Sequence, residues 1–262
     1  MCTLTVQSLP TGILATMNRD EALSRAPETS PVIHADDSIR WMAPHDGEKG
    51  GTWMGANEHG VVACLLNAYL PGESLLPDTS GHYQSRGEII PTMLAQGGGV
   101  EAVEWIESEL DPKKYPSFML LVFAKGIARC YTWHKHETMA CEDLLDAEWV
   151  LRSSSGWDSS EVSKWREDLF ADWRSDGEEM IDHLPKFHLI QEAGREDWSP
   201  LMKRSWSGTR SVTQVAIDFN DLKIDLRYWP QPYPGSHHAD VHLALPLIHA
   251  DSVSEKTESL RS

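Results

Sequence analysis

MCTLTVQSLPTGILATMNRDE, residues 1–21, is the stretch that decides the fold. Residues 3–6 alternate between polar and apolar side chains, residues 12–17 form a second short strand pattern, and Pro10-Thr11-Gly12 between them is turn chemistry. The stretch therefore predicts a β-hairpin whose first strand begins at Cys2. The end of the second strand, Asn-Arg-Asp-Glu, is then expected to lie close to Cys2.

The rest of the chain alternates between strand and helix patterns. Further strands are predicted at 52–55, 61–67, 117–124, 127–133, 148–151, 209–219 and 222–229, and helices at 87–95, 100–110, 161–173 and 177–187. The stretch from Pro27 to roughly Lys49 is predicted to be a loop. This order predicts an α+β fold in which two antiparallel sheets stack face to face with helices outside.

Composition limits the possible partners. The 262 residues, with 40% hydrophobic content, favour one domain over residues 2–250 and a disordered polar tail over 251–262. The net charge of −17 argues against nucleic acids and anionic membranes. We find no secretory signal and no apolar run long enough to span a bilayer, so we expect a cytoplasmic protein with free thiols and no stable membrane insertion.

Cys2 follows the initiator Met directly. Cysteine is small enough for methionine aminopeptidase to remove Met1, which leaves a thiol and a free α-amino group on one residue. The pKa of an α-amino group is roughly 7.7–8, so it can take and return a proton near neutral pH. Such a residue is a nucleophile with its own base. The alternative is an accident of the second codon, which the Arg-Asp pair on the adjacent strand makes less attractive.

Arg19 and Asp20 end the second strand. Arg19 beside the Cys2 thiolate would lower the pKa of the thiol. Asp20 can accept a hydrogen bond from the α-ammonium group or hold Arg19 in place, because a guanidinium fork suits a carboxylate. The alternative is an exposed strand end closed by solvated charges.

Three later features are candidates for the same site. Asn67, at the end of a strand expected to be buried on both faces, is either an oxyanion donor or a turn-forming residue. The segment 50–53, Gly-Gly-Thr-Trp, shapes a pocket wall or only a turn. Arg210 supplies a second positive charge to the site or lies on the surface.

The histidine pairs His134/His136 and His237/His238 are the obvious metal candidates. No cysteine or carboxylate spacing supports either pair, so we interpret them as surface histidines and expect no metal and no cofactor.

Several ordered motifs together resemble the NRDE family, also called the transport and Golgi organisation 2 homologues. The motifs are Met1-Cys2, Asn18-Arg19-Asp20-Glu21 with Ser24-Arg25, the segment 50–55, Asn67 with Tyr69, residues 85–88 (Ser-Arg-Gly-Glu) and residues 208–211 (Gly-Thr-Arg-Ser). The resemblance implies a branch of the N-terminal nucleophile (Ntn) hydrolases, whose fold is a four-layer αββα sandwich.

A more distant similarity to bile salt hydrolases and penicillin V acylases implies roles for individual residues. It places Cys2, Arg19, Asp20, Asn67 and Arg210 in the catalytic site. The family motifs add Asn18, Trp53 and Tyr69 as substrate-binding residues. Those enzymes carry a further Asn in a middle strand, and here residues 151–155, Leu-Arg-Ser-Ser-Ser, occupy the corresponding place.

Two functions follow as hypotheses. The first is a cysteine hydrolase or acyltransferase that acts on a linear amide or thioester of a small molecule. The second is a non-enzymatic carrier of haem, lipid or acyl-coenzyme A, since the resemblance links the family to secretory organisation, to lipid and acyl-coenzyme A balance and to haem mobilisation. The sequence leaves the substrate and the oligomeric state open.

Overall fold

The computed structural model describes residues 2–35, 38–69, 83–135, 137–155, 159–175, 186–236 and 238–248. Most of the helix predicted over 177–187 and the tail over 251–262 lie outside these residues. At the start of the described range 186–236, a short 3-10 helix spans Lys186–Leu189.

The first sheet carries the amino-terminal hairpin. Its order is β10-β1-β2-β11-β12-β13, and every pairing is antiparallel. Its strands are β1 (Cys2–Leu9), β2 (Gly12–Ala22), β10 (Trp149–Ser154), β11 (Ser207–Asp218), β12 (Lys223–Pro230) and β13 (Val241–Pro246). The predicted hairpin is confirmed, with Cys2 opposite Arg19 in the β1–β2 register.

The second sheet is also antiparallel and follows chain order from β3 to β9. Its strands are β3 (Thr29–His34), β4 (Trp41–His45), β5 (Met54–Asn57), β6 (Val62–Asn67), β7 (Phe118–Ala124), β8 (Ile127–Trp133) and β9 (Ala140–Asp143). The apolar strand β6 is central and buried from Val62 to Leu66, as its sequence predicts.

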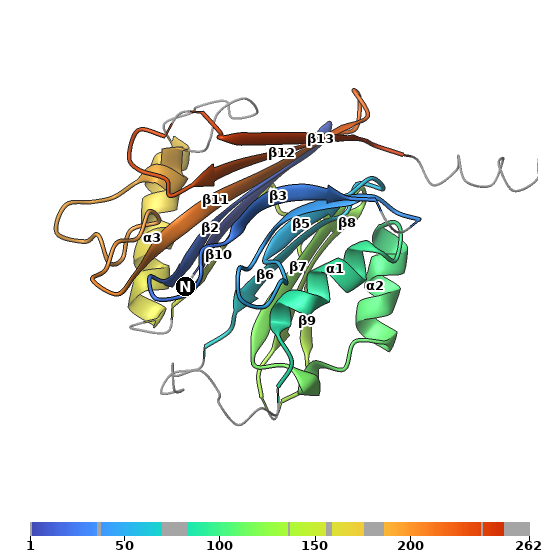
Figure 1. The fold of residues 1–262 in the computed structure, drawn as a ribbon, viewed down its shortest axis with the longest axis horizontal. Helices are drawn as coiled ribbons and strands as arrows, with labels where there is room; N and C mark the ends of the chain where they lie inside the picture. Colours follow the sequence, from blue (N-terminus) through green and yellow to red (C-terminus); the bar gives the residue numbers. More distant parts are fainter. Residues whose placement is uncertain are drawn as a thin grey trace, which may run out of the picture.

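The two sheets stack face to face, and helices cover their outer faces (Figure 1). Helix α3 (Ser159–Ser175) covers the first sheet, and α1 (Ile89–Leu94) and α2 (Gly99–Ser108) cover the second. One apolar core fills the space between the sheets, and another lies between the second sheet and its helices. The fold is therefore the predicted four-layer αββα sandwich.

Four strands, β3, β4, β9 and β13, were not predicted. The expected loop from Pro27 to Lys49 is wrong, because it contains β3 and β4. Strand β3 is an edge strand with one buried residue, Pro31, so it carries no apolar alternation. All four residues of β9 are exposed, so no buried face could reveal it. Edge strand β13 does alternate, with Leu245 in the core and Val241 and Leu243 packed against it, so its periodicity was a signal that the prediction missed.

Alternation along the first hairpin divides its polar residues between two faces. Leu4 and Met17 belong to the core between the sheets, and Cys2 packs against that core. Thr3 and Asn18 point the other way and bond to groups on and beside the helix layer. Neighbouring residues of a strand therefore face different layers of the sandwich, so only one of each pair can point its side chain into a cavity between the sheets.

Candidate active site

A cavity of about 690 Å³ lies at the Cys2 end of the sandwich. Its volume is within the range of roughly 300–1,000 Å³ that is usual for small-molecule sites. Among the predicted site residues, the cavity is lined by Cys2, Arg19, Asp20, Trp53 and Asn67. The structure therefore brings five of the eight together.

Cys2 begins β1 between two neighbours. Its half-buried side chain lies opposite Arg19 on β2 and Ser154 on β10. The backbone nitrogen of Cys2 donates a hydrogen bond to Ser154 Oγ at 3.0 Å, and Ser154 is buried. Of the segment 153–155, Ser154 is thus the residue whose hydroxyl meets the Cys2 backbone nitrogen.

Burial raises the pKa of the Cys2 thiol above its usual value. The charged amino terminus, the backbone N–H of Asp20 and Arg19 act in the opposite direction but do not outweigh burial. Arg19 thus acts on the thiol pKa in the predicted direction, but burial outweighs it and the net shift is upward. Since the thiol keeps its proton at neutral pH, attack on a carbonyl needs a base beside the sulfur.

Arg19 is buried and held by three carboxylates. Its guanidinium lies 2.7 Å from Asp46, 3.3 Å from Glu28 and 3.4 Å from Glu21. It also stacks over the Trp53 ring, 4.5 Å from the ring centroid. These partners replace the predicted Arg19–Asp20 pair, because consecutive residues of a strand point to opposite faces. Arg19 therefore links the floor of the cavity to the segment that follows β4.

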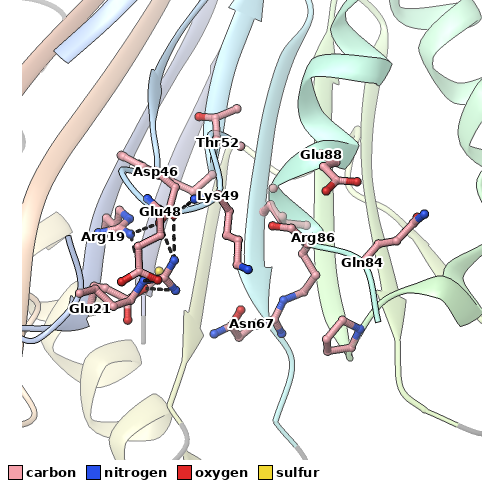
Figure 2. A pocket seen from close by; sticks show the side chains of 18 of the residues that line it. Arg19, Glu21, Asp46, Glu48, Lys49, Thr52, Asn67, Gln84, Arg86 and Glu88 are labelled. Atoms are coloured by element: carbon pink, nitrogen blue, oxygen red, sulfur yellow. Dashed lines mark hydrogen bonds and ion pairs between the residues drawn. The ribbon is translucent and has the colours of Figure 1, made fainter. Parts of the chain in front are cut away.

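Asp46 fixes that segment. Its carboxylate accepts hydrogen bonds from the backbone N–H groups of Glu48 and Lys49 and binds Arg25 at 2.8 Å. Burial alone would raise the pKa of Asp46, but these N–H groups and Arg25, together with Arg19, lower it. Figure 2 shows this ion cluster on one wall of the cavity. The sequence pair Asp46-Gly47 could have indicated this turn, since Asp side chains commonly accept hydrogen bonds from backbone N–H groups in turns.

Asp20 bonds to Thr209 rather than to Arg19. Thr209 Oγ1 donates to Asp20 Oδ1 at 2.6 Å. Burial raises the pKa of Asp20, and the charges of Arg166 and the amino terminus oppose that rise. The predicted role of Asp20 as acceptor for the α-ammonium group of Cys2 stays a prediction.

Asn67 ends β6 with its side chain at the cavity. Its amide donates to Tyr69 Oη at 2.7 Å, and no turn bond of this side chain is found in the described part of the chain. Burial raises the pKa of Tyr69, so its hydroxyl stays protonated at neutral pH. Tyr69 does not line the cavity; it fixes the amide that does.

The structure does not bring Asn18 and Arg210 to the cavity. Asn18 is fully buried on the opposite face, where its amide donates to the carbonyls of His188 and Pro200. Arg210 is buried as well, so it is neither a cavity residue nor a surface residue. It donates to the Ala22 carbonyl at 3.2 Å and lies 3.8 Å from Glu28, the carboxylate that also binds Arg19.

Two further cations line the cavity. Figure 2 shows Lys49 and Arg86 extending toward Asn67 from different segments. The segments touch through glycines: a Cβ on Gly51 would lie 2.6 Å from the Gly87 carbonyl carbon, and Thr52 N donates to Gly87 O at 3.0 Å. Because this contact joins residues far apart in sequence, no local pattern predicts it.

Metal ligands and membrane spans were also sought. Over the described ranges, no three His, Cys, Asp or Glu side chains gather as a metal site would require. His136 and His237 lie outside those ranges. No helix in the part of the chain that the structure describes is long and apolar enough to cross a bilayer.

Comparison with known proteins supports the fold. A model of the family described as Transport and Golgi organisation 2 matches residues 1–220. A search of curated proteins finds no match. One similar solved structure is the N-acylethanolamine-hydrolyzing acid amidase ortholog of Caenorhabditis elegans, with a TM-score of 0.58 and 11% identity over 94% of this chain and 100% of that one. Another is a mutant of the conjugated bile acid hydrolase of Clostridium perfringens, with a TM-score of 0.54 and 10% identity over 94% of this chain and 92% of that one.

Proposed function

The chain belongs to the transport and Golgi organisation 2 family, and on this premise we propose that it is an Ntn-type cysteine hydrolase or acyltransferase. Its substrate would be a linear amide or thioester of a small polar molecule. The observation that carries the proposal is the meeting of the Cys2 thiol, the Cys2 nitrogen bonded to Ser154, and the Asn67 amide at one cavity. The similar structures support it, since one is an amidase and the other a hydrolase by description.

In the proposed first step the α-amino group of Cys2 takes the thiol proton. The sulfur forms a bond to the substrate carbonyl carbon, and the carbonyl π electrons move to oxygen. Asn67 donates a hydrogen bond to this oxyanion with the amide hydrogen that Tyr69 does not use. Ser154 and Asp20 orient the amino group, which matters because the thiol is not ionised beforehand.

In the second step the oxyanion collapses and the bond to the leaving group breaks. The α-ammonium gives its proton to the departing amine or thiolate, and a thioester remains on Cys2. Water or an acceptor amine then attacks the thioester and loses its proton to the α-amino group. Expulsion of the Cys2 sulfur, which regains a proton, restores the starting state.

A polar substrate is favoured by the cavity wall. Nine of the described lining residues are charged, including Lys49 and Arg86, and the larger apolar contributions come from Trp53, Leu65, Tyr83 and Pro116. Haem or a long acyl chain gains stability mainly by burying apolar surface. We therefore place the carrier hypothesis second, for want of an observation that favours it.

Removal of Met1 tests the premise of the mechanism. We expect intact mass spectrometry of the protein made in a bacterial cytosol to show loss of Met1, because the mechanism needs the free α-amine of Cys2. We also expect at least one member of a panel of acyl p-nitroanilides and acyl thioesters to add one acyl group to Cys2. A chain that keeps Met1 or carries an acetyl group on it would have no catalytic amine and would rule the mechanism out.

Ser154→Ala should slow acylation of Cys2 by about tenfold, the usual scale for losing one hydrogen bond that orients a reacting group. The matched control is Ser153→Ala, because Ser153 Oγ has no hydrogen-bond partner among the described residues. Stopped-quench mass spectrometry of both variants measures the rates. Equal effects of the two substitutions would contradict the assigned role of Ser154.

A further inference from the structure

Arg166 is a buried charge that the mechanism above does not use. It projects from α3, is fully buried, and is the largest side chain of that kind in the described part of the chain. Removing a guanidinium from water is costly unless polar partners and an opposite charge replace the water. Its place in the fold therefore needs an explanation.

Its hydrogen bonds join the first strand to a loop. Nη1 donates to Thr3 Oγ1 at 2.6 Å, Nε to the Trp198 carbonyl at 2.7 Å and Nη2 to the Ser199 carbonyl at 3.0 Å. Thr3 is the residue after the nucleophile. Arg166 thus holds the back of the strand that presents Cys2 to the cavity.

Asp20 holds the same loop from the other side. Thr209 donates to Asp20, and the Met202 N–H donates to Thr209 Oγ1 at 2.8 Å. The loop over 198–202 therefore lies between Arg166 and Asp20. All three hydrogen-bond acceptors of Arg166 are neutral, and Asp20 is the opposite charge that acts most strongly on it.

We propose that Arg166 is a positioning residue of the Cys2 site, which holds the Thr3 end of β1 and lies across the loop over 198–202 from Asp20 as its buried counter-charge. An ionised Asp20 can bind the α-ammonium group of Cys2, whereas a protonated Asp20 loses that charge-assisted bond. This inference rests on the proposed function for its catalytic consequence. The Arg166–Asp20 pair itself can be tested without a substrate.

Other ionisable groups near the pair do not replace Arg166. His188 is fully buried, bonds to Thr5 and Asn18, and has its pKa lowered to about 3 by burial and by Arg166, so it is neutral at working pH. The amino terminus, the Cys2 thiol and Arg204 are the remaining groups coupled to the pair. The charge of Arg204 opposes the rise in the pKa of Asp20 less strongly than that of Arg166.

The first experiment compares thermal unfolding of Arg166→Gln, Arg166→Lys and Thr3→Val with the parent between pH 5 and pH 8. The folded state raises the pKa of Asp20, and loss of Arg166 raises it further. Folded Arg166→Gln should therefore bind more protons than the folded parent, so its deficit in melting temperature should be largest at pH 8 and shrink toward pH 5. Arg166→Lys and Thr3→Val keep the charge, and their deficits should not depend on pH.

The second experiment adds Asp20→Asn. In that background Arg166→Gln should cost less, with no pH dependence, because the buried carboxylate is gone. If Arg166→Gln alone does not fold, recovery of a cooperative transition in the double variant supports the pair. Failure to recover, or a pH-independent deficit in a folded Arg166→Gln, overturns it.

The catalytic consequence is read from acylation of Cys2 by p-nitrophenyl acetate, followed by intact mass. Relative to the parent, Arg166→Gln should lose about tenfold more rate at pH 6 than at pH 8, and Arg166→Lys and Thr3→Val should not show this change. A parallel loss at both pH values would mean a purely structural role. If neither this ester nor any member of the amide and thioester panel acylates the parent, the proposed function fails while the unfolding data still decide the pair.

Discussion

Cys2→Ala should abolish covalent acylation and lower turnover by roughly 10⁴–10⁶-fold, the scale seen when a catalytic nucleophile is removed. Alanine is also small enough to permit removal of Met1, so the variant keeps a free α-amine and loses only the sulfur. Intact mass after exposure to a reactive acyl thioester, together with product release, measures the effect. Melting temperature should change little, because the half-buried Cys2 side chain lies at the edge of the core.

The matched control is Cys141→Ala. Cys141 is exposed on the edge strand β9, whereas burial raises the pKa values of the Cys64 and Cys130 thiols. Cys141 is thus the competing site for any reagent, and all acylation experiments are best run in its absence. An acyl group that persists in Cys2→Ala but disappears in Cys141→Ala would show that Cys2 is not the nucleophile.

Asn67→Ala should lower turnover by about 10²–10³-fold, the usual loss for one oxyanion donor. The side chain is half-buried, and within the described residues its one side-chain hydrogen bond is to Tyr69, so the free energy of unfolding should change little. Tyr69→Phe should have a smaller effect, because it removes the partner that orients the amide and leaves the amide in place. Steady-state kinetics with the best substrate of the panel measures both.

Asn220→Ala is the control for the loss of an asparagine. Asn220 is exposed in the turn after β11, at the opposite end of the sheet from Cys2. It should leave turnover unchanged. If Asn67→Ala were equally silent while Cys2→Ala is inactive, the oxyanion would have to be bound by other donors, and the assignment of Asn67 would be wrong.

The sequence predicted the positions of those site residues that a single hairpin or a single strand places. The hairpin pattern over residues 1–21 places Arg19 opposite Cys2, and the apolar run before Asn67 places that amide at the end of a buried strand. The same alternation could have excluded Asn18, since it shares a face with Thr3 and not with Arg19. No local pattern could have excluded Arg210 from the site, because its position depends on the pairing of β11 with β2, which joins residues almost 200 positions apart.

The sequence by itself determined the layers, the central strands and the position of the proposed nucleophile Cys2, because periodicity and the place of a cysteine in the sequence are local properties of the chain. Only the tertiary structure decided what surrounds that residue. Ser154 reaches the Cys2 nitrogen through β10, and Arg166 reaches Thr3 from α3. Burial in the assembled core, rather than any neighbouring residue in sequence, raises the pKa of the thiol. Such contacts depend on strand order and on the exclusion of water, and a single strand or helix specifies neither.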